Sequence, residues 1–190
     1  MLIKHIFDYI FVLILLILLV GLIVCMIIIS TLDTKDFGLF TQVRVGKNGK
    51  LFKIYKIRSM VGIQENSVTT TSHRITKFGG FLRQYKLDEL PQLINILKGE
   101  MSFVGPRPDI IGYADELVGE DRIILSVKPG ITGPAQLKYR NEEELLSLQS
   151  NPIWYNDNVI WPDKVLINKD YVNNWSFKKD LYYIFKTILK

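Results

Sequence analysis

Two neighbouring carboxylates, and an arginine held between two prolines, are the residues of this chain best suited to chemistry. Asp88 and Glu89 stand in the run Lys-Leu-Asp-Glu-Leu-Pro-Gln-Leu, and Arg107 stands in Gly-Pro-Arg-Pro. Carboxylate oxygens bind hard cations such as Mg²⁺, and a guanidinium can hold phosphate through two hydrogen bonds. The combination favours a metal-dependent reaction on a phosphate. Taken alone, the carboxylate pair could instead be a helix cap, and Arg107 a structural ion-pair partner.

Two further groups of polar residues could contact the same phosphate. The Gly/Pro segment 128–133 contains Lys128, Gly130 and Thr132, although a Pro-Gly turn is by itself a weak signal. Lys56 and Arg58 lie two residues apart after a predicted turn, so on a strand they point to one face. That face is either a solvated strand edge or a basic wall facing a diphosphate or a membrane.

The elements that position these residues follow from turn signals and apolar spacing. Asn48-Gly49 predicts a β-hairpin between strands at 40–45 and 51–57. The polar segment 64–72 predicts a loop. A helix is predicted from Asp88, as its N-cap, to Lys98, with Leu90, Leu93, Ile94 and Leu97 on one face and Gly99 as its stop. Further helices are predicted near Thr76, at 110–118, 142–149 and 163–173, and from 176 to the end.

The apolar run Tyr9–Ile29 predicts a membrane-inserted helix. It has 21 residues and no charge, and at ~1.5 Å per residue it could cross a hydrocarbon core. A cleaved signal peptide is the alternative, but the run is long and no small-x-small site follows. We therefore expect a membrane segment at 1–32 and a catalytic domain at 33–190. The helix from Ser176 is amphipathic and either faces the core or lies in the headgroup region.

Charge and the content of cysteine and histidine limit which binding partners, cellular compartments and metal sites are expected for this chain. Lys4 and Asp8 cancel, so the net charge of +5 lies beyond residue 30 and would draw the domain to anionic lipid. Nucleic acid is not an expected partner, because no basic helix, zinc spacing or aromatic RNA-binding motif occurs. The single cysteine, Cys25, permits no disulfide framework and favours a reducing compartment. The two histidines, His5 and His73, are too far apart to suggest a metal cluster.

Several motifs together closely resemble the bacterial sugar transferases, the monotopic phosphoglycosyl transferases, in their minimal form. The resemblance covers nearly the whole chain. It rests on Phe40-Thr41-Gln42, on residues 52–56, on 86–92, on 98–108 and on Pro129-Gly130-Ile131-Thr132-Gly133.

The resemblance implies transfer of a sugar 1-phosphate from a nucleotide diphosphate sugar, usually a UDP-sugar, to polyprenol phosphate, with release of UMP. Such a reaction begins assembly of a surface polysaccharide or glycoconjugate. It further implies that Asp88 is a nucleophile that forms a covalent phosphosugar intermediate, that Glu89 with Asp88 holds Mg²⁺, and that Arg107 clamps phosphate. The expected location is the cytoplasmic face of the bacterial inner membrane.

The expected fold is α/β (α+β), helix-rich, with a small β-hairpin, amphipathic interfacial helices and one N-terminal membrane helix. Family members usually carry Arg in place of Lys128, often Trp in place of Pro134, and a Ser-Pro break where this chain has Gly21. A re-entrant helix is expected from the resemblance, and a straight crossing is the alternative. An inactive membrane-anchored scaffold of the same fold is the alternative function. The oligomeric state stays open, with a homodimer among the options.

Overall fold

The computed structural model describes residues 2–62 and 74–189, which are rich in helix and carry small sheets. The predicted loop 64–72 lies outside the described residues. The chain forms two compact units: unit 1 is Met1–Arg44 with Leu51–Met101, and unit 2 is Val45–Lys50 with Ser102–Lys190. The N-terminal helix belongs to unit 1. The division into a membrane segment at 1–32 and a catalytic domain at 33–190 stays a prediction.

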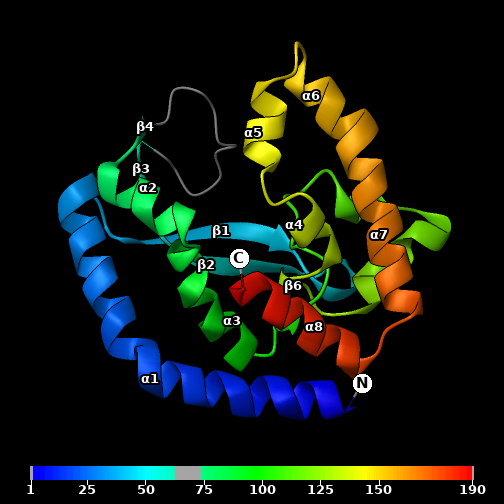
Figure 1. Ribbon diagram of the computed structural model, residues 1–190, viewed down its shortest axis with the longest axis horizontal. Helices are drawn as coiled ribbons and strands as arrows, with labels where there is room; N and C mark the ends of the chain where they lie inside the picture. The colour runs from blue at the N-terminus through cyan, green and yellow to red at the C-terminus, as the bar shows by residue number, and fades with distance from the viewer. Residues whose placement is uncertain (1, 63–73, 190) are drawn as a thin grey trace. The chain divides into compact units, whose positions relative to one another are not determined.

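Unit 1 begins with one long helix, α1 (Leu2–Thr34). Figure 1 shows that α1 is bent, with one arm leading from the N terminus into a second arm that lies beside α2 (Lys77–Gln84). The helix contains no proline, so the bend is not a proline kink; Gly21 is its one residue without a Cβ. Within the described part of the chain, α1 alone is long and apolar enough to cross a membrane, judged by length and composition. Most of its apolar side chains are exposed, unlike those of a core helix.

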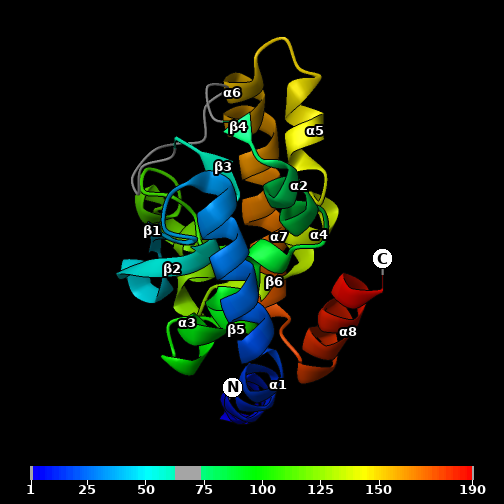
Figure 2. The same ribbon diagram turned by 90° about the vertical axis from the view of Figure 1, so that its left-hand side faces the viewer.

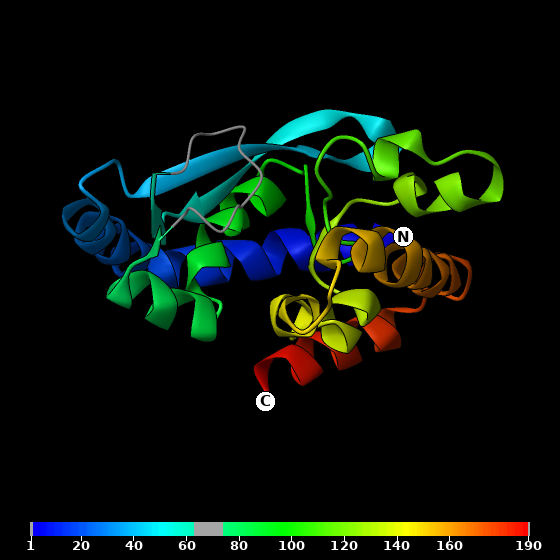
Figure 3. The same ribbon diagram turned by 90° about the horizontal axis from the view of Figure 1, so that it is seen from above.

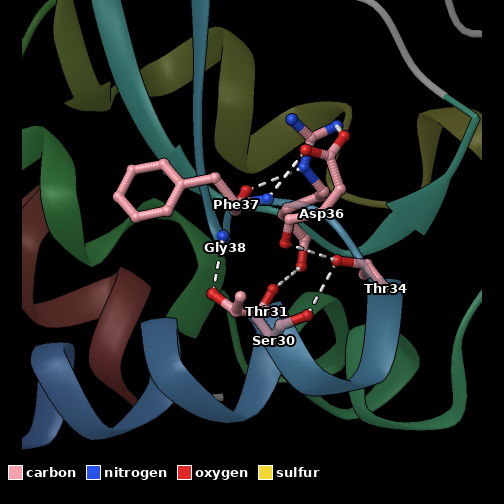
Figure 4. Close-up of polar contacts among 7 residues, drawn as sticks. Ser30, Thr31, Thr34, Asp36, Phe37 and Gly38 are labelled. Atoms are coloured by element: carbon pink, nitrogen blue, oxygen red, sulfur yellow. Dashed lines mark hydrogen bonds and ion pairs between the residues drawn. The ribbon is translucent and has the colours of Figure 1, made fainter.

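Hydroxyl side chains tie the end of α1 to the chain that follows it (Figure 4). Ser30 Oγ donates to the carbonyl oxygen of Arg58 at 2.5 Å. Thr31 Oγ1 accepts from the N–H of Gly38 at 2.9 Å. A Cβ on Gly38 would collide with the carbonyl oxygen of Ile27, so the loop can approach the helix this closely only with glycine there. These contacts fix where the strand after α1 begins.

The predicted hairpin is confirmed. Strands β1 (Leu39–Val45) and β2 (Leu51–Ile57) are neighbours in a two-stranded sheet. Asn48 and Gly49 both have positive φ, 58° and 77°, the conformation that makes Asn-Gly a strong turn signal. β2 carries Lys56 and therefore positions one of the candidate site residues.

The helix predicted near Thr76 is also confirmed as α2. Thr76 caps it, because its Oγ1 accepts from the N–H of Gly79 at 2.9 Å. The helix follows a short antiparallel pair, β3 (Met60–Val61) and β4 (Arg74–Ile75). A Cβ on Gly79 would collide with the backbone of Ser59, so α2 packs tightly on the end of β2 and its following residues.

The helix predicted over Asp88–Lys98 is wrong in its first half. Residues Leu87–Gln92 form a 3₁₀ helix (η2), and the α-helix that follows, α3, spans only Leu93–Leu97. Pro91 explains the difference, because it has no N–H to donate and its ring disfavours the α conformation in the residue before it. Asp88 therefore lies inside η2, and Lys86 occupies the cap position in its place.

The apolar face predicted for this segment is only partly correct. Ile94 is exposed, whereas Leu93 and Ile96 are buried. A 3₁₀ helix has three residues per turn instead of 3.6, so η2 shifts the phase of the helix that follows. Gly99, with φ of 76°, ends the helix as predicted.

Unit 2 contains a parallel strand pair that the sequence did not predict. β5 (Ser102–Val104) pairs with β6 (Gly130–Thr132), with Ser102 opposite Gly130 and Val104 opposite Thr132. The Gly/Pro segment 128–133 is thus partly a strand. Three-residue strands are too short to show alternation, and their pairing joins segments far apart in sequence.

The predicted helices of unit 2 are confirmed in three of four places: α5 (Glu142–Ser147), α7 (Trp161–Asn173) and α8 (Phe177–Ile188). Short helical segments that were not predicted are α4 (Pro134–Lys138), α6 (Pro152–Tyr155), η1 (Lys47–Gly49), η4 (Gly119–Ser126) and the π-helical η5 (Asn156–Ile160).

The fourth prediction, a helix at 110–118, is wrong. Only a 3₁₀ turn, η3 (Ala114–Glu116), forms there. Gly112 has φ of 99°, and the Asp115 carboxylate accepts from the N–H groups of Gly112 and Tyr113 at 2.8 and 3.1 Å. These local side-chain contacts compete with helix formation. The turn packs in a small core with Val45, Ile124 and Leu125.

α8 presents its apolar side to the outside. Leu181, Phe185 and Ile188 are exposed. The inward side carries Asp180, which accepts from Tyr171 Oη at 2.7 Å and from the Trp175 indole at 2.9 Å. The core-facing interpretation of this helix is therefore wrong, and its position in the headgroup region stays a prediction.

Candidate active site

The two adjacent carboxylates lie on η2 in unit 1, directly after a strained residue. Lys86 has φ of 58°, in the left-handed region that a residue with a Cβ rarely adopts. Its carbonyl oxygen accepts from the N–H of Glu89, which closes the first turn of η2. The strain is one observation that marks this turn as a functional segment.

Glu89 is buried and paired with Lys56. The distance from Lys56 Nζ to Glu89 Oε1 is 3.3 Å, and both side chains are largely shielded from water. An ion pair in such surroundings needs accurate geometry, since each charge has lost its hydration. The structure thus joins two of the predicted site residues, one from β2 and one from η2.

Asp88 differs from its neighbour. Its Oδ1 is buried and, among the residues that the structure describes, has no hydrogen-bond partner. Burial raises the pKa of the Asp88 carboxyl above its usual 3.8, and the Glu89 charge raises it further. The positive charges of Lys56, Arg83 and Lys86 oppose this shift in pKa without cancelling it. A buried carboxylate oxygen without a partner is costly to fold and is available to a substrate.

Asn95 positions the ion pair, and the sequence analysis missed it. Its Oδ1 accepts from the N–H of Tyr55 at 3.2 Å, and its Nδ2 donates to Lys53 O and to Glu100 Oε2, both at 2.8 Å. Asn95 is completely buried. It therefore holds the strand that carries Lys56 against the helix that follows Glu89. The available signal was a polar residue directly between two isoleucines, Ile94 and Ile96.

Arg58 has a different set of contacts from Lys56. Its guanidinium forms an ion pair with Asp36 at 3.2 Å, donates through Nε to the carbonyl oxygen of Phe37 at 2.9 Å, and lies over the Phe40 ring at 5.4 Å. These contacts connect the end of β2 to the loop after α1. They support a structural role for Arg58, which anchors the sheet to the membrane-helix candidate.

In unit 2, the two Gly/Pro segments lie backbone to backbone. The N–H of Gly105 donates to Thr132 O at 2.9 Å, and the N–H of Gly130 donates to Pro106 O at 2.8 Å. A Cβ on Gly105 or on Gly130 would collide with the backbone of the other segment. Gly130 is therefore required for packing. The arrangement fixes the backbone on both sides of Arg107, whose side chain is half-buried.

The other predicted binding residues of unit 2 are partly occupied by structural contacts. Thr132 Oγ1 lies 2.6 Å from Thr187 Oγ1 of α8, and one of the two hydroxyls donates to the other. Lys128 is half-buried beside the strand pair. Gln136, which the sequence analysis missed, donates through Nε2 to Gly105 O at 3.0 Å, and its Oε1 is buried with no partner in the described residues. Its amide thus braces the segment that leads to Arg107.

The carboxylate pair fits a magnesium ion. No group of three or more His, Cys, Asp and Glu side chains suited to a metal occurs in residues 2–62 and 74–189. Mg²⁺ in phosphate-transfer sites is commonly held by one or two carboxylates together with substrate oxygens. Such a pair is supplied by Asp88, whose Oδ1 has no partner in the described part of the chain, and by Glu89, whose charge Lys56 balances.

Comparison with known proteins decides the family. Residues 1–190 match the family described as Bacterial sugar transferase. The chain belongs to the bacterial sugar transferase family. Over 192 residues it is 34% identical to the uncharacterized sugar transferase EpsL of Bacillus subtilis, a match that covers 100% of this chain and 87% of that protein. The resemblance inferred from the sequence motifs is therefore confirmed.

Two other relatives of this bacterial sugar transferase have more specific names. A UDP-glucose:undecaprenyl-phosphate glucose-1-phosphate transferase of Escherichia coli is 36% identical over 160 residues, which are 80% of this chain and 32% of that enzyme. A putative undecaprenyl-phosphate N-acetylgalactosaminyl 1-phosphate transferase of Bacillus subtilis is 43% identical over 122 residues, 62% of this chain and 68% of that protein. The chain thus spans about a third of the longer enzyme and most of EpsL.

Proposed function

We propose that this sugar transferase moves a sugar 1-phosphate from a UDP-sugar to a polyprenol phosphate and releases UMP, as the first step in assembly of a surface polysaccharide or glycoconjugate. The observation that carries the proposal is the buried Oδ1 of Asp88, which has no hydrogen-bond partner within residues 2–62 and 74–189 and lies on the residue next to Glu89 of the Lys56–Glu89 pair. The names of the relatives support the donor and acceptor classes.

The reaction proceeds in two displacements on one phosphorus atom. An oxygen of the Asp88 carboxylate attacks the phosphorus that carries the sugar, and the bond from that phosphorus to UMP breaks. UMP leaves with the bonding electrons, and the sugar phosphate is held as an acyl phosphate. A phosphate oxygen of the polyprenol phosphate then attacks the same phosphorus and returns Asp88 to its ionised form. A carboxylate needs no general base, because it is already ionised near neutral pH.

The neighbouring residues make approach of one anion to another possible. Glu89 and Asp88 would hold Mg²⁺, which supplies charge neutralisation to the diphosphate. Lys56 holds the Glu89 carboxylate in place through their ion pair. Arg107 binds phosphate through its planar guanidinium, with its backbone held by the prolines at 106 and 108.

A donor panel tests the proposal. Membranes that contain the protein, undecaprenyl phosphate and Mg²⁺ are incubated with a series of radiolabelled UDP-sugars, and label in the lipid fraction is counted. We expect one or a few sugars to be transferred, with an equal amount of UMP formed. Lipid labelling no higher than in membranes without the protein, for every sugar, would favour the inactive scaffold.

Arg107→Lys is expected to lower the rate of transfer by roughly 10²-fold, because an ammonium group cannot reproduce the two parallel hydrogen bonds of a guanidinium. Arg122→Lys is the matched control in the same unit, since Arg122 donates only to exposed backbone carbonyls of the described chain. The measurement is the initial rate of lipid labelling for both variants. Full activity of Arg107→Lys would assign Arg107 a structural role.

The topology of α1 forms a separate prediction. We expect both ends of α1 to lie on the cytoplasmic side, as a bent re-entrant helix places them. Leu2 is 75% exposed, so Leu2→Cys in a Cys25→Ser background provides an accessible thiol near the N terminus. Ser147→Cys, on the exposed surface of α5, reports the side on which the catalytic part lies.

An impermeant thiol reagent added to intact cells should label neither cysteine, and it should label both after the cells are broken. Labelling of Leu2→Cys but not of Ser147→Cys in intact cells would show a straight crossing.

A further inference from the structure

One face of α2 in unit 1 carries exposed aromatic side chains that the proposed chemistry leaves unexplained. Phe81 and Tyr85 are 49% and 57% exposed, and Phe78 is half-buried. The ring centroids of Phe78 and Phe81 lie 6.3 Å apart, and those of Phe81 and Tyr85 lie 5.1 Å apart. The three rings therefore form one aromatic ladder, which extends along about 10 Å of helix.

Contacts on the opposite side of α2 determine that the aromatic ladder faces outward. Leu82 is completely buried, and Gly79 packs directly on the backbone of Ser59. The helix cannot rotate to bury Phe81 without losing both contacts. Figures 2 and 3 show α2 beside the C-terminal arm of α1, the apolar helix of the same unit, and the two helices are in contact. Contiguous aromatic surface that stays exposed beside an apolar helix indicates a binding surface for an apolar ligand or lipid.

The ladder ends close to the carboxylate that we propose as nucleophile. Tyr85 and Asp88 are three residues apart, so their Cα atoms lie within about 11 Å of one another. The residue between the ladder and η2 is Lys86, whose side chain is exposed and whose charge acts on Asp88. An apolar surface, a cation and a nucleophile thus follow one another along a short stretch of chain.

We propose that the aromatic ladder of α2 binds the first isoprene units of the polyprenol phosphate acceptor, with Lys86 attracting the acceptor's phosphate toward Asp88. The inference rests on the proposed function. The acceptor has the two properties that the surface complements, an anionic head and a long apolar chain. Stacked rings offer a large, rigid surface to such a chain. A bilayer could also cover exposed rings, but it would not require them to end beside the nucleophile.

The test compares long and short acceptors with Phe81→Ala. Alanine favours helix, so α2 should stay folded. For undecaprenyl phosphate, KM should rise about tenfold, which is the loss expected when one ring no longer covers an apolar chain. For dimethylallyl phosphate, whose single isoprene unit is too short to cover the ladder, KM should change less than about twofold. Exchange of labelled UMP into the UDP-sugar, which needs no acceptor, should be unchanged.

Phe185→Ala in α8 is the matched control, because Phe185 is also an exposed ring on an amphipathic helix. It should leave the KM of both acceptors unchanged. Equal KM changes for the two acceptors, or no KM change for undecaprenyl phosphate, would overturn the inference. Recovery of less Phe81→Ala than unaltered protein in sedimented membranes would also overturn it, because that result would show that the ring contributes to membrane binding. Absence of both transfer and UMP exchange in the unaltered protein would contradict the proposed function itself.

Discussion

Asp88→Asn is expected to abolish sugar phosphate transfer and to leave the protein folded. An amide cannot attack phosphorus to form an acyl phosphate, and removal of a nucleophile lowers turnover by factors on the order of 10⁴ or more. The measurements are radiolabel in the lipid fraction and UMP exchange into the UDP-sugar. Both should fall together, because both need the first displacement.

A matched control is Asp121→Asn in unit 2. Asp121 pairs with Lys169 at 2.7 Å, so this variant also removes a carboxylate that faces a cation. It should retain transfer and exchange. Near-normal turnover by Asp88→Asn would contradict the covalent mechanism. Loss of transfer with intact UMP exchange would show that Asp88 is needed only for the second displacement.

The same substitution should raise the thermal unfolding midpoint at neutral pH. The pKa of Asp88 is higher in the folded protein than its usual 3.8, mainly because of burial. Its contribution to stability is thus fully present below the ordinary pKa and is lost as pH rises through the raised one. At pH 7 the ionised carboxylate therefore costs stability, and a neutral amide removes that cost. As pH is lowered, the transfer rate should likewise fall with a midpoint above the usual pKa of an aspartate.

Local signals in the sequence predicted the elements of the fold that depend on neighbouring residues. Asn48-Gly49 located the hairpin, because only a few residues adopt two successive positive φ angles readily. The long apolar run located α1, and the apolar patterns that begin near Thr76 and at Ser176 located two further helices, α2 and α8. The prediction failed at η2, because Pro91 disfavours the α-helix predicted over its first half.

Contacts between distant segments could not be predicted in this way. Three-residue strands such as β5 and β6 carry no periodicity, and their pairing joins residues about thirty positions apart. The ion pair between Lys56 and Glu89 likewise joins two elements, and it depends on Asn95, which lies on neither. The sequence therefore identified the chemical groups of unit 1 without indicating which of them meet.

Glu89→Gln is the second variant with a large expected effect. The amide removes one anionic oxygen donor, so the Mg²⁺ concentration needed for half-maximal activity should rise at least roughly tenfold, with a severe loss of rate at saturating Mg²⁺. Lys56, 3.3 Å away and largely buried, would lose its counter-charge. We therefore expect the unfolding free energy to fall by about 1–3 kcal/mol, the opposite sign to Asp88→Asn.

The double variant Lys56→Met/Glu89→Gln separates these two effects. It removes the buried charge that Glu89→Gln leaves behind, so stability should recover, since a buried ion pair can be replaced by neutral groups at little cost. Transfer should not recover, because the anionic oxygen is still missing. Glu142→Gln, which breaks the comparable pair with Lys164 at 2.6 Å, controls for loss of an ion pair elsewhere and should keep its Mg²⁺ dependence. Recovery of transfer in the double variant, or a wild-type reaction that EDTA leaves intact, would limit Glu89 to balancing the charge of Lys56.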